Sequence, residues 1–111
     1  MRTIKSGREI STIFTDGRRY NTPYITILVS RNANQHDREG RVAFIAGKKL
    51  GGAVWRNRAK RRLRGVCYEV GGPFPGWDVV LIARKGIENA PFDDMKSQLT
   101  RALNKARIVN G

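Results

Sequence analysis

Cysteine and histidine are almost absent from this 111-residue chain, which contains only Cys67 and His36. A single cysteine cannot form an intrachain disulfide, which excludes a secreted disulfide scaffold and favours a reducing compartment. We therefore expect the protein in the cytoplasm. One cysteine and one histidine are also too few for a structural zinc site, which needs four nitrogen or sulfur ligands. We expect no metal site formed by the protein itself.

Long apolar runs and negative charge are scarce as well. No run approaches the roughly 18 apolar residues of a transmembrane helix, and residues 1–7 lack the apolar core of a signal peptide. Only 9 acidic residues oppose 22 basic ones, so the net charge is +13. Such a field attracts polyanions, nucleic acid first and an anionic membrane second. The 40% hydrophobic content excludes a disordered basic tail, and the length fits one domain, residues 1–111.

The positive charge is concentrated in one segment. Residues 48–64 hold eight Lys and Arg and no acid, whereas the remaining 14 basic and 9 acidic residues are spread thinly. At 100° per residue, Trp55, Ala59, Leu63, Val66, Cys67 and Val70 fall on one stripe of a helix over residues 53–70. A solvated basic helix is the simpler alternative, but a solvated face usually mixes both signs. The pattern therefore predicts a helix that docks by one face and presents cations on the other.

The rest of the chain predicts an α+β sandwich in the order α-β-β-α-β-α. A helix at 5–16 has Ser6 as a candidate N-cap and Gly17 as a candidate stop. Strands are expected at 23–30 and 41–47, joined as a long hairpin by a polar loop at 31–40 that contains His36. The apolar run at 77–84 is typical of a central strand covered on both faces, and Pro91 starts a last helix.

The sequence shows no arrangement of residues that is typical of an enzyme active site. His36 has no flanking nucleophile motif, and Cys67 on the apolar stripe is better explained as a core residue. Residues 47–52 are rich in glycine but do not form a phosphate-binding loop, because no Ser or Thr follows the Gly-Lys pair. Asp93 and Asp94 fit the positive end of a helix. The residues alone indicate a nucleic-acid-binding module, with no catalytic residues.

Residues 47–64, GKKLGGAVWRNRAKRRLR, resemble the signature of the bacterial ribonuclease P protein family, K-K-x-G-N-A-V-x-R-N-R-x-K-R-x-x-R. The resemblance extends in order over about residues 4–106. It implies the family's α-β sandwich, with a further strand and a β-α-β crossover of left-handed sense, against the usual right-handed rule. Gly52 stands where the family usually has Asn, Ile10 where it often has Phe, and Leu28 where some members have Tyr.

The resemblance also implies a function and partners. Ribonuclease P is a ribonucleoprotein endoribonuclease that removes the 5′ leader of precursor tRNA. The large RNA subunit carries the catalytic centre and uses Mg²⁺, so the implied partners of this chain are that RNA and the leader. No protein-bound cofactor, membrane partner or obligate protein partner is expected, and self-association stays open.

Two sets of residues are assigned on this basis. The expected contacts to the catalytic RNA are Lys48, Lys49, Arg56, Asn57, Arg58, Lys60, Arg61 and Arg64. The expected leader cleft comprises Phe14, Ile10, Tyr24, Leu28, Phe44, Arg84 and Lys85, in which Tyr24 or Phe44 replaces the missing aromatic residues. Arg and Lys suit phosphates, and aromatic rings stack on bases. The alternatives are a structural RNA-binding protein, such as a small ribosomal protein, and a protein-only metal-dependent nuclease.

Overall fold

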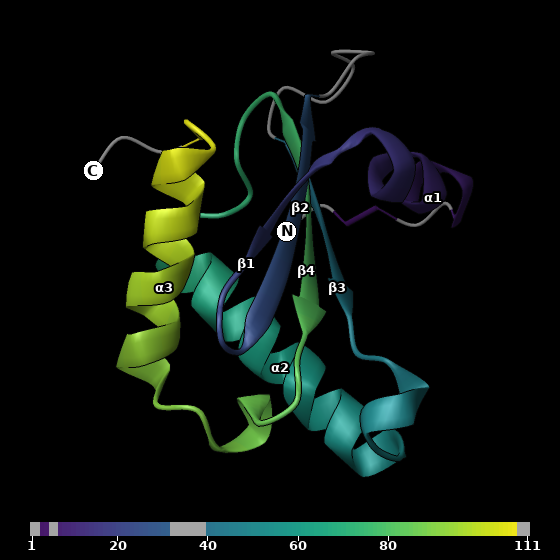
Figure 1. Cartoon of the computed structure of the whole chain (residues 1–111), viewed down its shortest axis with the longest axis vertical. Coiled ribbons are helices and arrows are strands. Elements are labelled where there is room, and N and C mark those ends of the chain that lie inside the picture. Colours follow the sequence, from purple (N-terminus) through teal and green to yellow (C-terminus); the bar gives the residue numbers. More distant parts are fainter. Residues whose placement is uncertain (1–2, 5–6, 32–39, 109–111) are drawn as a thin grey trace.

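The computed structural model describes residues 3–4, 7–31 and 40–108 (Figure 1). Ser6 and His36 lie outside the described residues. Within them, the helices and strands expected at 5–16, 23–30, 41–47, 53–70, 77–84 and after Pro91 are confirmed, with small shifts in their bounds. The elements in chain order are α1 (Gly7–Asp16), β1 (Arg18–Asn21), β2 (Ile25–Arg31), β3 (Arg41–Ile45), the 3-10 turn η1 (Lys48–Leu50), α2 (Ala53–Glu69), β4 (Trp77–Ala83), the 3-10 turn η2 (Ile87–Asn89) and α3 (Phe92–Lys105).

Strand β4 lies inside the sheet, as its unbroken apolar sequence predicted. The strand order is β1-β2-β4-β3, and β4 pairs antiparallel with β2 and parallel with β3. The predicted hairpin between 23–30 and 41–47 is therefore wrong, because β4 separates the two strands. Val79, Val80 and Leu81 are at most 1% exposed, which requires neighbours on both edges and cover on both faces. The β3-α2-β4 unit is the predicted crossover, and its hand stays a prediction.

Strand β1 is the element that the residue pattern did not reveal, so the order α-β-β-α-β-α is corrected to α-β-β-β-α-β-α. Its residues, Arg-Arg-Tyr-Asn, are mostly exposed and show no apolar alternation. Backbone pairing with β2, from Arg18 opposite Val29 to Asn21 opposite Thr26, places it at the edge of the sheet. An edge strand needs backbone partners on one side only, so its side-chain pattern gives little indication that the segment is a strand.

The two faces of the sheet carry separate cores, and different helices cover them (Figure 1). Helices α2 and α3 cover one face, where Ile27, Leu81 and Leu63 belong to the larger apolar cluster. Helix α1 covers the other face, where Ile13, Leu28 and Val80 belong to a smaller cluster. Alternate residues of a strand point to opposite faces, so neighbours such as Ile27 and Leu28 enter different cores. The sandwich is thus helix–sheet–helix, and the α+β class is confirmed.

The predicted apolar stripe of α2 is buried as expected. Ala59, Leu63, Val66 and Cys67 are all 0% exposed. Gly52 is the N-cap of this helix and provides no side-chain cap, so the departure from the family's Asn removes one possible local hydrogen bond. Among the described residues, no helix combines the length and the apolar character that a membrane span requires.

Helix α1 is tied to the sheet by an ion-pair network at Arg41. The Arg41 guanidinium donates two hydrogen bonds to the Asp78 carboxylate, at 3.1 and 2.8 Å, and lies 2.5 Å from a Glu9 carboxylate oxygen. Both acids raise the pKa of Arg41, chiefly through these hydrogen bonds. Because Arg41 is on β3, Asp78 on β4 and Glu9 on α1, one side chain links three elements.

Candidate nucleic-acid interface

The residues predicted to contact a catalytic RNA form a continuous basic segment on η1 and α2. All of these residues are exposed except Arg56, which is half-buried, and all are basic except Asn57. We call the set the basic ridge: Lys48, Lys49, Arg56, Asn57, Arg58, Lys60, Arg61 and Arg64. Within the described part of the chain, none of its seven cations forms a salt bridge. Like charges on one helix repel each other, and a bound polyanion relieves that repulsion.

Neighbouring elements hold the ridge in place. The Trp55 indole Nε1 donates a 2.9 Å hydrogen bond to a Glu88 carboxylate oxygen on η2. Arg62 donates to the Ala90 carbonyl, and the Arg64 guanidinium lies 5.6 Å from the centre of the Phe44 ring. Sequence reasoning missed the roles of Glu88 and Arg62. The one available signal was that Arg62 flanks the apolar stripe, where a long side chain reaches the core edge.

The Trp55–Glu88 hydrogen bond predicts a titration at acid pH. This bond, with a smaller contribution from Arg58, lowers the pKa of Glu88. A group whose folded pKa is depressed stabilises the fold above its unfolded pKa, about 4.3 for Glu, and loses that effect as pH falls through the folded pKa. We expect the Trp55 indole N–H resonance in NMR spectra to move with a midpoint below about 4.3.

Trp77 provides an internal control for this titration, because no hydrogen bond joins its indole to a described carboxylate. The Glu88→Gln variant should abolish the transition at Trp55 and leave the Trp77 resonance as in wild type. A Trp55 midpoint at or above the ordinary glutamate pKa would contradict the hydrogen bond.

Three of the predicted leader-cleft residues gather on the α1 face of the sheet. Leu28 is only 1% exposed and lies in the smaller cluster, with Ile10 packed half-buried against it. Phe14 on α1 is 43% exposed, so its ring is available to a ligand. Ile45 and Ile82 pack half-buried against the same cluster. Sequence reasoning missed these two residues, although each lies two positions from a buried residue of that face, Ala43 or Val80.

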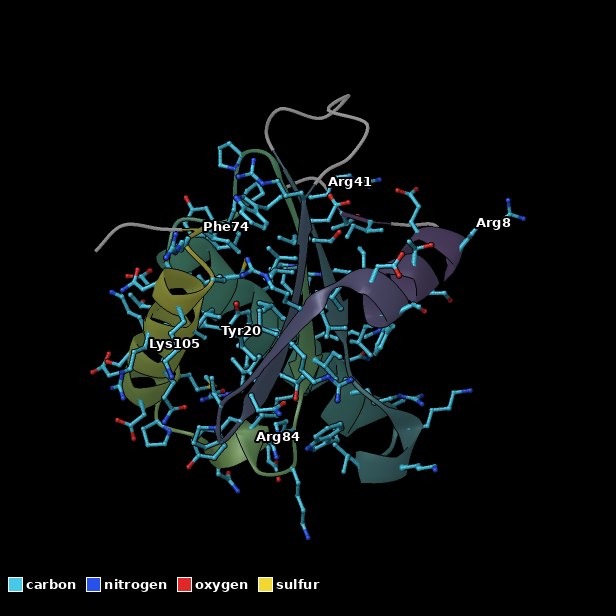
Figure 2. The ribbon with its side chains drawn as sticks, turned by 45° about the horizontal axis from the view of Figure 1, so that its top comes forward. Arg8, Tyr20, Arg41, Phe74, Arg84 and Lys105 are labelled. Atoms are coloured by element: carbon cyan, nitrogen blue, oxygen red, sulfur yellow. The ribbon has the colours of Figure 1, made fainter. Side chains whose placement is uncertain are left out.

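The other four residues of that set do not join Phe14. Tyr24 and Phe44 pack against the larger cluster on the opposite face of the sheet. Phe44 is paired in register with Leu81, and Arg64 covers its ring, so it belongs with the ridge. Arg84 donates to the Thr22 carbonyl at 2.6 Å and lies beside η2, far from Arg8 on α1 (Figure 2). Lys85 follows it in the chain. The structure therefore does not place the seven residues on one surface.

Comparison with known proteins gives the family. A model of the ribonuclease P family matches residues 1–107. The chain belongs to the ribonuclease P protein family. The ribonuclease P protein component of Streptococcus mutans is 36% identical over 106 residues, which cover 95% of this chain and 86% of the relative. The component from Syntrophomonas wolfei is also 36% identical, covering 95% and 87%.

Solved ribonuclease P proteins share the fold. The Staphylococcus aureus protein superimposes with a TM-score of 0.80 over 99% of both chains, at 24% identity. The Thermotoga maritima protein gives a TM-score of 0.73 over the full length of both chains, at 25% identity. The three helices and the four-stranded mixed sheet described above are therefore the ribonuclease P protein architecture.

The described residues of this chain offer little for nucleophilic or metal chemistry. Cys67 is 0% exposed, and burial raises the pKa of its thiol to about 12. The thiol is consequently protonated at neutral pH, which agrees with the predicted core role. Among the described residues, no three His, Cys, Asp or Glu side chains are grouped so that they could hold a metal ion.

Proposed function

We propose that this chain is the protein subunit of ribonuclease P, which binds the catalytic RNA and the 5′ leader of precursor tRNA and assists removal of that leader. The single observation that supports this most strongly is the basic ridge, whose cations form no salt bridge among the described residues. Its guanidinium groups match phosphates as paired donors, and Asn57 can both donate to and accept from a base edge.

We assign the chemical step to the RNA subunit. The described residues offer no cluster of metal ligands, and Cys67 is buried and protonated. Mg²⁺ would therefore be held by the RNA, where it can stabilise the attacking and leaving oxygens of phosphodiester hydrolysis. The role of this chain is to bind and orient the RNA partners, and we expect it to act in the cytoplasm.

The leader is assigned to the α1 face. Phe14 offers an exposed ring on α1, and the half-buried Ile10, Ile45 and Ile82 lie on the face of the sheet that α1 covers. Aromatic residues bind single strands by stacking on bases. This assignment keeps Phe14 and Ile10 from the predicted set and leaves Tyr24 and Phe44 to the opposite face.

A reconstitution experiment tests the proposed function. Precursor tRNA is incubated at low Mg²⁺ with the protein alone, with a bacterial ribonuclease P RNA alone, and with both. We expect no cleavage by the protein and faster cleavage by the mixture than by the RNA. Cleavage by the protein alone would indicate a protein-only nuclease instead. An RNA whose rate the protein does not change would favour a structural RNA-binding protein.

The leader assignment predicts a selective loss in the Phe14→Ala variant. Loss of one stacked base costs about 1–3 kcal/mol, so precursor tRNA should bind the reconstituted enzyme at least about fivefold more weakly. Mature tRNA, which lacks the leader, should bind as before. Ser11→Ala, an exposed change on the same helix, is the matched control. Equal losses for both tRNAs would remove Phe14 from the leader site.

A further inference from the structure

A second basic surface lies between β1 and α3, at the sheet edge opposite β3. It consists of two adjoining grooves, with volumes of about 350 and 390 Å³. Arg18 and Ala106 both line the second groove, and the Arg18 guanidinium donates to the Ala106 carbonyl at 3.1 Å, which links β1 to the C-terminal end of α3. We call this surface the β1–α3 trough, and its basic residues are Arg19, Arg101 and Lys105 in one groove and Arg18, Arg31 and Arg107 in the other.

The trough gathers charge that is dispersed in the sequence. Of the 14 Lys and Arg outside residues 48–64, six line it, against a single acid, Asp16. Arg101, Lys105 and Arg107 are exposed and form no salt bridge or side-chain hydrogen bond within the described residues. Like charges gathered on one surface repel one another unless an anion lies between them. The charge arrangement therefore suits an extended polyanion.

Two aromatic rings distinguish the trough from a plain basic patch. The Arg31 guanidinium lies 5.0 Å from the centre of the Trp77 ring, and Arg18 lies 5.9 Å from that of Tyr20. Both rings are half-buried and line the grooves. A basic groove with aromatic surfaces is the arrangement that binds single-stranded nucleic acid, because cations follow the phosphates and rings stack on bases.

The trough is separate from the surfaces discussed above. In Figure 1, α3 and β1 lie on one side of the molecule, and η1 with the first turns of α2 lies on the other. Figure 2 shows Tyr20 and Lys105 on the side where α3 faces β1, away from Arg8 on α1. A ligand in the trough would therefore lie away from the basic ridge and would meet α1 only at its last residue, Asp16.

We propose that the β1–α3 trough binds a single-stranded RNA segment, independently of the basic ridge and of the α1 face. Arg101, Lys105 and Arg107 contact its phosphates, and Trp77 stacks on a base. The proposal goes beyond the proposed function, and it holds whichever RNA the ridge binds.

An NMR titration of the full chain with an octauridylate, U8, tests the proposal directly. Trp55 and Trp77 are the only tryptophans, so their indole N–H resonances report the ridge and the trough separately. We expect the Trp77 resonance to shift to saturation. A Trp77 resonance that stays fixed while U8 saturates the protein would overturn the proposal. A shift at lower concentration with an RNA hairpin duplex than with U8 would overturn the single-strand assignment.

Three double variants remove two positive charges each. Their comparison shows whether U8 binds through direct contacts in the trough or only through the net positive charge of the protein. Arg101→Gln/Lys105→Gln should weaken U8 binding, followed at Trp77, by about tenfold or more, because two phosphate contacts are lost, and it should also lower the salt dependence. Arg58→Gln/Arg61→Gln on the ridge and Arg8→Gln/Lys96→Gln elsewhere should change U8 binding much less. Equal weakening by all three would overturn the proposal. Lys105→Gln/Arg107→Gln provides a second trough variant if the first does not fold.

This test is independent of ribonuclease P activity, because it measures binding of U8 to the protein alone. If U8 does not bind in the trough, the result of the reconstituted cleavage reaction is not affected. Failure of the proposed function would appear in the cleavage reaction while the Trp77 shift persisted.

Discussion

The Arg58→Ala/Arg61→Ala variant should bind ribonuclease P RNA about 100-fold more weakly than the wild-type protein. Both side chains are exposed on α2 and form no salt bridge among the described residues, so the RNA would be their partner. A hydrogen bond to a charged group contributes about 1.5–3 kcal/mol, and every 1.4 kcal/mol changes the affinity about tenfold. The measurement is a filter-binding titration of the two proteins against one RNA.

The salt dependence identifies the cause of that loss. Each phosphate contact removed lowers the slope of log affinity against log salt by about one, so the double variant should lose about one to two units. Arg8→Ala/Lys96→Ala removes the same charge away from the ridge and is the matched control. An unchanged slope in the ridge variant would exclude phosphate contacts by Arg58 and Arg61.

Leu63→Ala should produce the largest loss of stability. Leu63 is 0% exposed and lies in the cluster that joins α2 to the sheet. Truncating a buried leucine costs about 2–5 kcal/mol, through lost apolar transfer and the cavity left behind. In a domain of this size that loss lowers Tm by roughly 8 °C or more. Thermal unfolding followed by circular dichroism measures the shift.

Val54→Ala is the matched control for Leu63→Ala. Val54 lies on the same helix but is 85% exposed, so its truncation should change the free energy of unfolding by less than about 0.5 kcal/mol. Below its Tm, folded Leu63→Ala protein should still bind RNA, because the cations of the ridge are unchanged. Equal stability of the two variants would mean that this stripe does not dock α2.

The local elements could be predicted because their patterns repeat over a few residues. The stripe through Ala59 and Leu63 places α2 on a core at its observed position. The apolar run of β4 predicts a central strand, and Gly17 ends α1 where expected, with its N–H donating to the Ile13 carbonyl at 2.8 Å. A side chain at Gly17 would also meet the Ile13 and Val29 carbonyls, at 2.5 and 2.9 Å from its Cβ.

Strand pairing could not be predicted in the same way. The interior position of β4 separates β2 from β3, although those two strands are neighbours in the sequence. The polar strand β1 is held at the edge of the sheet by backbone hydrogen bonds with β2, which any residue except proline can make. Pairing of this kind depends on which arrangement buries the most apolar surface, and no short segment contains that information.

The candidate sites also differ in whether local sequence patterns predict them. The cations of the basic ridge lie close together in the sequence, on one turn and one helix, so the sequence by itself determined that surface. Only the tertiary structure decided that Phe14 and Phe44 lie on opposite faces of the sheet, and that Arg31, Arg101 and Arg107 line one trough. The physical reason is that helical periodicity is local, whereas the face and neighbours of a strand residue are set by register with strands far along the chain.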